Sequence, residues 1–294
     1  MSITRASVIL MILAVSVPSQ TSAQDVLRWK FQRNEQLKYT AVQNMETLMK
    51  VGDNEIKQAL NHTMDVAWKV LDVGANGSTV MHQVVTRAQI KIAGGPDGEV
   101  GFDTANPVES ENLQVKAMGE AFGKIVNQNF TITMQPTGEI DSVEIPAGLR
   151  EAINTSAAGN TAALNEDTLK QMMKQSAVTL PANAVSPGSK WTSTQSVPLP
   201  FGTINVKSTM TLVRTDGTSA IIDVVPEISV TPKEGAPVKV SVTKSSGRGQ
   251  VTFDVVKGHV TKSELVVSMD MEIDSGQRNF RQTVNQSTAL TLVP

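Results

Sequence analysis

The sequence predicts an α+β protein that is mainly antiparallel β, with two related β-rich halves and a helical segment between them. Two observations carry this prediction. Over much of the chain apolar and polar residues alternate, which is typical of strands with one buried and one exposed face. The Ala-rich stretch 147–176 instead has helical spacing, and Pro181 and Pro187 follow it. The predicted organisation is a signal peptide at 1–23, a β-rich half with one helix at 24–146, a helical linker segment at 147–187 and a second β-rich half at 188–294.

The first 23 residues have the pattern of a secretory signal peptide. Arg5 precedes an apolar run from Ala6 to Val17, and Thr21-Ser22-Ala23 offers a small-residue cleavage site. The run is shorter than the roughly 20 apolar residues that span a bilayer. We therefore expect cleavage after Ala23, export to the periplasm or the extracellular space, and no transmembrane segment in the mature chain.

Composition narrows the class of protein further. The chain has no cysteine, so an exported form has neither disulfides nor the Cys of a lipoprotein anchor, which suits a bacterial envelope better than a eukaryotic secretory pathway. The formal net charge of -2 gives no reason to expect binding to nucleic acid or to an anionic membrane surface. Only 4% of residues are aromatic, which argues against a platform for stacking sugars or bases.

In the first half, two alternating segments flank Gly74–Gly77, whose Asn-Gly step suits a tight hairpin. The first segment places Met64, Val66, Trp68 and Val70 on one face. The second is predicted to share a face among the residues Val80, His82, Val84, Thr86, Ala88, Ile90 and Ile92.

The second half shows the same pattern around Asp216-Gly217, with alternating residues on both sides. Its clearest strand runs from Glu264 to Asp274, and Asp274–Gln277 then forms a turn into a last strand within Phe280–Val293. One face of the clearest strand holds the apolar residues Leu265, Val267, Met269, Met271 and Ile273.

Two segments interrupt the β pattern with helical spacing. The first is Val108–Asn127. The second, Ala147–Ser176, is predicted to hold two helices split near Gly159-Asn160, with Asn165 capping the latter.

The halves themselves resemble each other. Lys38–Gln43 is similar to Lys190–Gln195, and each precedes a hairpin with a Gly turn, at Gly77 and Gly217. The similarity indicates either a diverged duplication or only the self-similarity of any β-meander.

Four motifs together resemble an uncharacterised family of exported bacterial β-rich proteins. They are the signal peptide, the early Leu27–Phe31 followed by Leu37-Lys38-Tyr39, the central Leu180-Pro181 with Val185–Trp191, and the late strand pair Gly249–Val260. No activity is assigned to that family, so the resemblance implies compartment and architecture alone.

The polar residues present no recognised catalytic or metal-binding motif, and we predict no catalytic residue, no metal site and no cofactor. No two of His62, His82 and His259 have metal-ligand spacing; His82 is expected half-buried in its strand and His259 solvent-facing in a turn. The acidic run Asp270–Gly276 has some calcium-loop character, but its intervening apolar residues favour a solvated strand face.

Methionine is the other compositional signal, with 13 in the chain. Those at apolar positions indicate either an adaptable core or a pliable apolar groove, because thioethers repack around varied partners. The groove hypothesis names the residues Met64, Trp68, Met118, Phe122, Met210, Met269 and Met271.

The sequence therefore favours a non-catalytic exported envelope protein that binds an apolar small molecule or another envelope protein in a groove between curved sheet and helices. The alternative from another class is a structural or scaffolding protein of the cell surface without a small ligand. A hydrolase with an inconspicuous Asp, Glu and His site is the third hypothesis.

Overall fold

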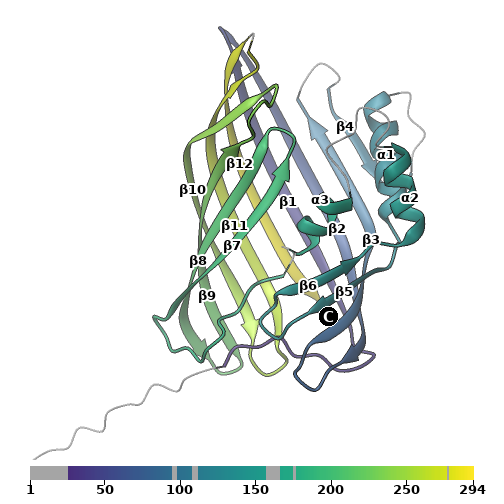
Figure 1. Ribbon diagram of the computed structural model, residues 1–294, viewed down its shortest axis with the longest axis vertical. Helices are drawn as coiled ribbons and strands as arrows, with labels where there is room; N and C mark the ends of the chain where they lie inside the picture. The colour runs from purple at the N-terminus through teal and green to yellow at the C-terminus, as the bar shows by residue number, and fades with distance from the viewer. Residues whose placement is uncertain (1–25, 95–97, 108–111, 157–165, 175–176, 277) are drawn as a thin grey trace, which may run out of the picture.

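The computed structural model describes residues 26–94, 98–107, 112–156, 166–174, 177–276 and 278–294. In these residues the chain forms one continuous antiparallel sheet of twelve strands with three helices (Figure 1). The prediction of a mainly antiparallel β protein is thus confirmed, whereas the helical part is small. The predicted signal peptide lies outside the described residues.

The strands follow one another as antiparallel neighbours along most of the sheet. The order is β6-β5-β3-β2-β1-β12-β11-β10-β9-β8-β7, and β4 pairs with the far part of β3. The strands are β1 Gln36–Val51, β2 Asn54–Val73, β3 Thr79–Ala93, β4 Val100–Asp103, β5 Phe130–Met134, β6 Ile140–Glu144, β7 Lys190–Leu199, β8 Gly202–Asp216, β9 Ser219–Pro232, β10 Lys239–Asp254, β11 His259–Asp274 and β12 Asn279–Val293.

The two β-rich parts of the chain share a single sheet. The first strand, β1, pairs with the last, β12, over a register that runs from Lys38 opposite Val293 to Lys50 opposite Arg281. The sheet is curled, so that β7, β8 and β9 face β1, β2 and β3 across an interior (Figure 1). Helix α3 (Glu166–Lys174) contacts both β6 and β7, the strands at the two ends of the order, and so bridges the open edges.

Helices form within both of the segments that the sequence singled out. Helix α1 (Leu113–Ile125) lies within the first, and α2 (Ala147–Ser156) and α3 lie within the second. Helix α1 contacts β4 and α2, and both helices lie at the side of the sheet (Figure 1). The predicted split at Gly159-Asn160 and the Asn165 cap lie outside the described residues.

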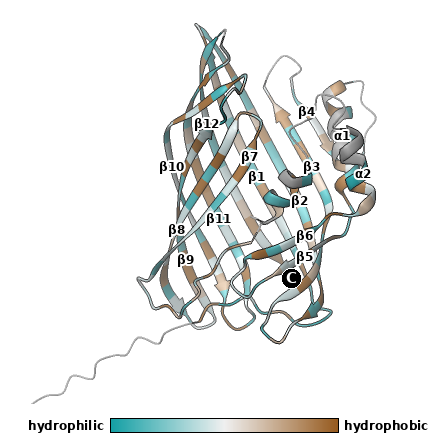
Figure 2. Cartoon of the chain, viewed as in Figure 1, coloured by the Kyte–Doolittle hydropathy of each residue, from teal (hydrophilic) through white to brown (hydrophobic). Residues whose placement is uncertain are grey.

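The alternation in the sequence becomes two chemically different faces of the sheet. Brown and teal residues alternate along the strands in Figure 2, and the exposed positions of β11 are mostly polar or charged. Glu264–Asp274 is part of β11, as predicted, and extends a strand that is 16 residues long. The acidic residues of this strand therefore belong to its outer face.

The face predicted for β3 is wrong in its first half. Thr79 and Met81 are buried, and Gln83 lines the interior, so His82 lies on the other face. A β-bulge opposite Asp65 and Val66 skips Thr86, after which Ala88 and Ile90 are buried. One extra residue thus moves the later side chains to the opposite face, as a bulge does.

The hydrophobic core fills one end of the curled sheet. Buried residues from the ends of many strands meet there, among them Tyr39, Trp68, Leu212 and Phe253. The segment 26–31 is not a strand, yet Leu27 and Trp29 enter this core, and the Trp29 ring lies 5.8 Å from those of Trp68 and Phe253. Residues from both halves of the chain share this one core.

Candidate functional site

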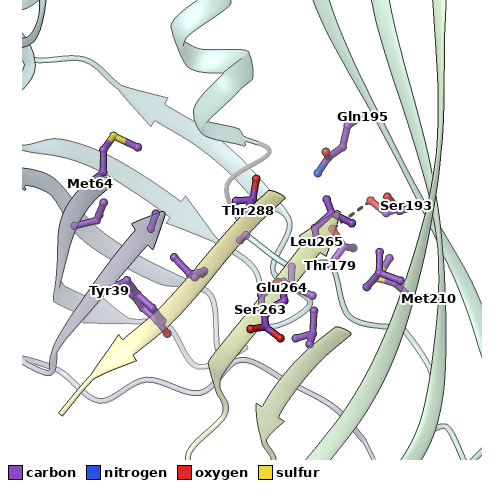
Figure 3. A pocket seen from close by; sticks show the side chains of 18 of the residues that line it. Tyr39, Met64, Thr179, Ser193, Gln195, Met210, Ser263, Glu264, Leu265 and Thr288 are labelled. Atoms are coloured by element: carbon purple, nitrogen blue, oxygen red, sulfur yellow. Dashed lines mark hydrogen bonds between the residues drawn. The ribbon is translucent and has the colours of Figure 1, made fainter. Parts of the chain in front are cut away.

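A cavity of about 400 Å³ lies above the core, inside the curled sheet, and is partly open to solvent (Figure 3). It is bordered by strands from both halves and by residues 177–179. The apolar side chains that line it are Ala41, Met64, Val66, Trp68, Ala177, Val178, Met210, Val224, Val251, Leu265 and Leu290. The polar ones are Tyr39, Gln83, Thr179, Ser193, Gln195, Ser208, Ser263, Glu264 and Thr288.

The cavity exists because small side chains occupy inward positions on neighbouring strands. Ala41 lies opposite Met64 on β2 and Leu290 on β12, and Ser193 on β7 lies opposite Ser208 on β8. Large side chains at these positions would extend the packed core into the same space. The strand alternation thus aims these residues inward, and their small volume leaves the interior unfilled.

A strap made of residues 177–180 crosses the closed end of the cavity. The Trp29 indole donates to the Val178 carbonyl at 2.9 Å, and the Trp191 indole donates to the Thr179 carbonyl at 3.0 Å. The Leu180 amide donates to the Thr137 carbonyl at 2.7 Å. The strap is therefore held by the N-terminal segment, by β7 and by the turn between β5 and β6.

Several polar groups of the lining are already bonded to protein atoms. Ser193 donates to the Thr179 hydroxyl at 3.4 Å (Figure 3), and the Tyr39 hydroxyl donates to the Val260 carbonyl at 3.1 Å. Burial, reinforced by the nearby Glu35 carboxylate, raises the pKa of Tyr39, so its hydroxyl stays neutral. Glu264 borders the cavity from an exposed position of β11, and its carboxylate pairs there with exposed Lys262 at 2.7 Å.

The prediction that His259 faces solvent is wrong, because the residue is only 3% exposed. Its Nε2 donates to the Lys30 carbonyl at 2.9 Å and lies 3.5 Å from the Glu35 carboxylate. Burial lowers the pKa of His259, although Glu35 opposes that effect. The ring also packs against Phe31, so His259 fastens the N-terminal segment to the core.

The predicted groove residues divide into two groups. Met64, Trp68 and Met210 line the cavity. Met269 and Met271 follow Leu265 at alternate positions of β11 and lie on the same face beyond it. Phe122 is apart from the cavity, on α1, where its ring lies 5.9 Å from that of His62; the side chain of Met118 lies outside the described part of the structure.

The strap and Gln83 are among the lining elements that the predicted groove did not include. The strap appeared in the sequence as the exit from a helical segment, and one of its two anchoring indoles, that of Trp29, comes from a distant position in the chain. Gln83 was placed on the wrong face by the bulge in β3. Leu265 could have been included in the predicted groove, since it shares the predicted apolar face with Met269 and Met271.

Within the described ranges, no group of three or more His, Cys, Asp or Glu residues could hold a metal ion. Among the helices that the structure describes, none has the length and apolar character needed to cross a membrane.

Comparison with solved structures finds a similar fold in lipovitellin, in a structure described as "Lipid-protein interactions in lipovitellin". The TM-score is 0.50 at 9% identity, over 90% of this chain and 26% of that one. The chain thus spans about a quarter of the length of the lipovitellin chain.

Two weaker matches carry no argument about the fold. The COG4313 outer membrane channel from Pseudomonas putida F1 has a TM-score of 0.26 at 7% identity, over 95% of this chain and 100% of that one. A DUF1329 family protein from Desulfovibrio piger ATCC 29098 has a TM-score of 0.14 at 7% identity, over 85% of this chain and 83% of that one.

No curated protein matches the sequence. Residues 76–290, well over half of the chain, match a family described as "Family of unknown function (DUF6263)", which agrees with the resemblance to an uncharacterised family. The chain belongs to this family, DUF6263.

Proposed function

We propose that the protein is an exported, non-catalytic protein of the bacterial envelope that binds an apolar small molecule in the cavity inside its curled sheet. The observation that carries the proposal is the cavity itself. Its volume of about 400 Å³ falls in the range of roughly 300–1,000 Å³ that is usual for small-molecule sites, and more than half of its lining residues are apolar. An unfilled apolar cavity forfeits packing contacts that an apolar ligand would supply.

The polar groups support binding rather than catalysis. Tyr39 and Glu264 are the titratable residues of the lining. The Tyr39 hydroxyl is held neutral and hydrogen bonded, while the Glu264 carboxylate is engaged by Lys262. The described residues of the lining therefore supply no carboxylate or imidazole pair for general acid–base chemistry.

The sequence pattern of residues 1–23 supports export. Cleavage after Ala23 would keep the buried residues Leu27 and Trp29 in the mature chain, so the core would survive removal of the signal peptide. The fold likeness to lipovitellin, a protein whose structure was described through its lipid contacts, is in keeping with an apolar ligand. The mainly polar outer face of β11 favours a carrier over a scaffold that associates through apolar patches.

A pair of alanine substitutions tests the proposal. Ala41→Phe places a large side chain in the cavity, and Ala289→Phe places the same side chain on the other face of the neighbouring β12. Each protein is titrated with the uncharged fluorophore N-phenyl-1-naphthylamine and examined by native mass spectrometry after extraction from the periplasm. Circular dichroism and urea unfolding check that each variant is folded.

We expect the wild type and Ala289→Phe to bind the fluorophore equally and to carry the same extra mass. Ala41→Phe should bind it at least about tenfold more weakly, because the added ring fills the site. A wild-type protein that is empty and binds no fluorophore contradicts the proposal. So does a folded Ala41→Phe protein that binds as the wild type does.

A further inference from the structure

The polar groups of the cavity narrow the class of ligand. Accepting the proposed function, we propose that the cavity selects an uncharged amphiphile whose hydroxyl head bonds to Gln83, such as a monoacylglycerol, over a fatty acid or another anionic lipid. The inference rests on the absence of cationic residues from the lining and on an unmet hydrogen bond at Gln83.

The first step concerns charge. Lysine, arginine and histidine are absent from the described residues that line the cavity, and the one acidic residue there, Glu264, is paired with Lys262. A carboxylate or phosphate entering this site would leave water without gaining a cation. Burial of an unpaired charge is so unfavourable that the anion would instead be excluded or bind as its protonated form.

The second step concerns Gln83, which lies on β3 between Trp68 of β2 and Phe130 of β5. Its side-chain oxygen is buried and has no hydrogen-bond partner among the described residues. Such an unmet acceptor is unfavourable, and because Gln83 also lines the cavity, a turn of its amide toward a bound ligand would supply the missing partner.

The third step identifies the complementary group. The oxygen and nitrogen of a glutamine amide exchange places when the amide is turned over, so the site can require either a donor or an acceptor. A hydroxyl group meets both requirements, since it donates one hydrogen bond and accepts others. The remaining lining is apolar around it, which suits a hydroxyl attached to a long hydrocarbon body.

Three other hydroxyls of the lining already have partners within the protein. Thr179 and Ser193 are bonded to each other, and the Tyr39 hydroxyl is bonded to Val260. Gln83 is thus the one lining residue whose buried side-chain atom lacks a partner in the part of the chain that the structure describes.

Two lipids with the same acyl chain separate the head group from the tail. Monopalmitoylglycerol and palmitate are each titrated, below their micelle-forming concentrations and at pH 8, while tryptophan fluorescence is followed; Trp68 lines the cavity. We expect monopalmitoylglycerol to bind at least about tenfold more tightly than ionised palmitate. Wild-type protein alone provides this comparison, so it does not depend on a variant that folds.

The role of Gln83 is tested by Gln83→Leu, with Gln250→Leu as a matched control. Gln250 bonds to Asp223 on exposed positions of β10 and β9. We expect Gln83→Leu to weaken monopalmitoylglycerol binding about fivefold, the equivalent of one hydrogen bond, and to leave palmitate binding within about twofold. Gln250→Leu should change neither affinity.

The outcomes distinguish this inference from the proposed function. Palmitate that binds as tightly as monopalmitoylglycerol overturns the head-group selection, and an unchanged affinity in Gln83→Leu overturns the role of Gln83. If N-phenyl-1-naphthylamine binds but monopalmitoylglycerol does not, the inference fails and the apolar site stands. If neither compound binds, the proposed function fails as well.

Discussion

Replacing Gly138 by alanine should break the attachment of the strap at the closed end of the cavity. Gly138 lies in the turn between β5 and β6 with a φ of 84°, a conformation that disfavours side chains. A Cβ there would press on the Val178 carbonyl oxygen and would lie 2.6 Å from Nε1 of Trp29. Those two atoms are the acceptor and the donor of a 2.9 Å hydrogen bond, so the methyl group and the bond exclude each other.

The expected loss of stability has two parts. The positive φ costs an alanine about 1–2 kcal/mol. Loss of the indole bond, with two partly buried partners left unpaired, adds about 1–3 kcal/mol. Gly217→Ala isolates the first part, because Gly217 also has a positive φ, 57°, but no atom lies within 4 Å of its added Cβ. We therefore expect Gly138→Ala to lose about 1–3 kcal/mol more than Gly217→Ala.

Urea unfolding, followed by tryptophan fluorescence and by circular dichroism, measures both variants against the wild type. The difference between the urea midpoints of the two variants, multiplied by their common m value, gives the contribution of the strap to the free energy of unfolding. Gly138→Ala should also bind N-phenyl-1-naphthylamine more weakly, because the strap forms one wall of the cavity. Equal destabilisation in the two variants would refute the reasoning, since only Gly138 faces the Trp29–Val178 bond.

Two further predictions concern the core. Burial lowers the pKa of His259 below its ordinary 6.5, so the unfolded chain takes up the proton first as the pH falls. The free energy of unfolding should therefore decrease below about pH 6.5, and less steeply in His259→Asn; equal slopes in urea titrations between pH 7.5 and pH 5 would argue against this. Ile222 is 0% exposed, so Ile222→Ala should cost about 2–5 kcal/mol. Val225 on the same strand is 51% exposed, and Val225→Ala should change the unfolding free energy by less than about 0.5 kcal/mol, as a comparison of urea midpoints will show.

The elements that the sequence predicted well are those governed by neighbouring residues. The turn at Gly74–Gly77 forms between β2 and β3, where the Asn76 side chain accepts a hydrogen bond from the Ser78 amide. The strand that contains Glu264–Asp274 and the helices within 108–127 and 147–176 also formed where their periodicity predicted them. Each of these patterns is complete within a few turns or strand residues, so local sequence suffices.

The errors arose where distant residues decide the environment. His259 follows a turn glycine and seemed exposed, but its partners Lys30 and Glu35 lie more than 220 residues earlier in the chain. The pairing of β1 with β12 also joins residues far apart in the sequence, and the hydrophobic periodicity of either strand does not predict it. The bulge in β3 is a different kind of error, because one unpaired residue at Thr86 reverses the face that alternation predicts.

The position of the cavity follows from side-chain volume rather than from apolar character. The predicted groove was sought through its methionines, yet Met269 and Met271 share the apolar face without lining the cavity. What marks the cavity is the small size of inward residues such as Ala41 and Ser208, at the level of the sheet where the packed core ends. Alternation in the sequence shows which residues face inward. The height of each inward residue relative to those on neighbouring strands depends instead on the register between the strands. That register places small residues side by side. The fold class can therefore be predicted from local sequence, whereas the position of the cavity cannot.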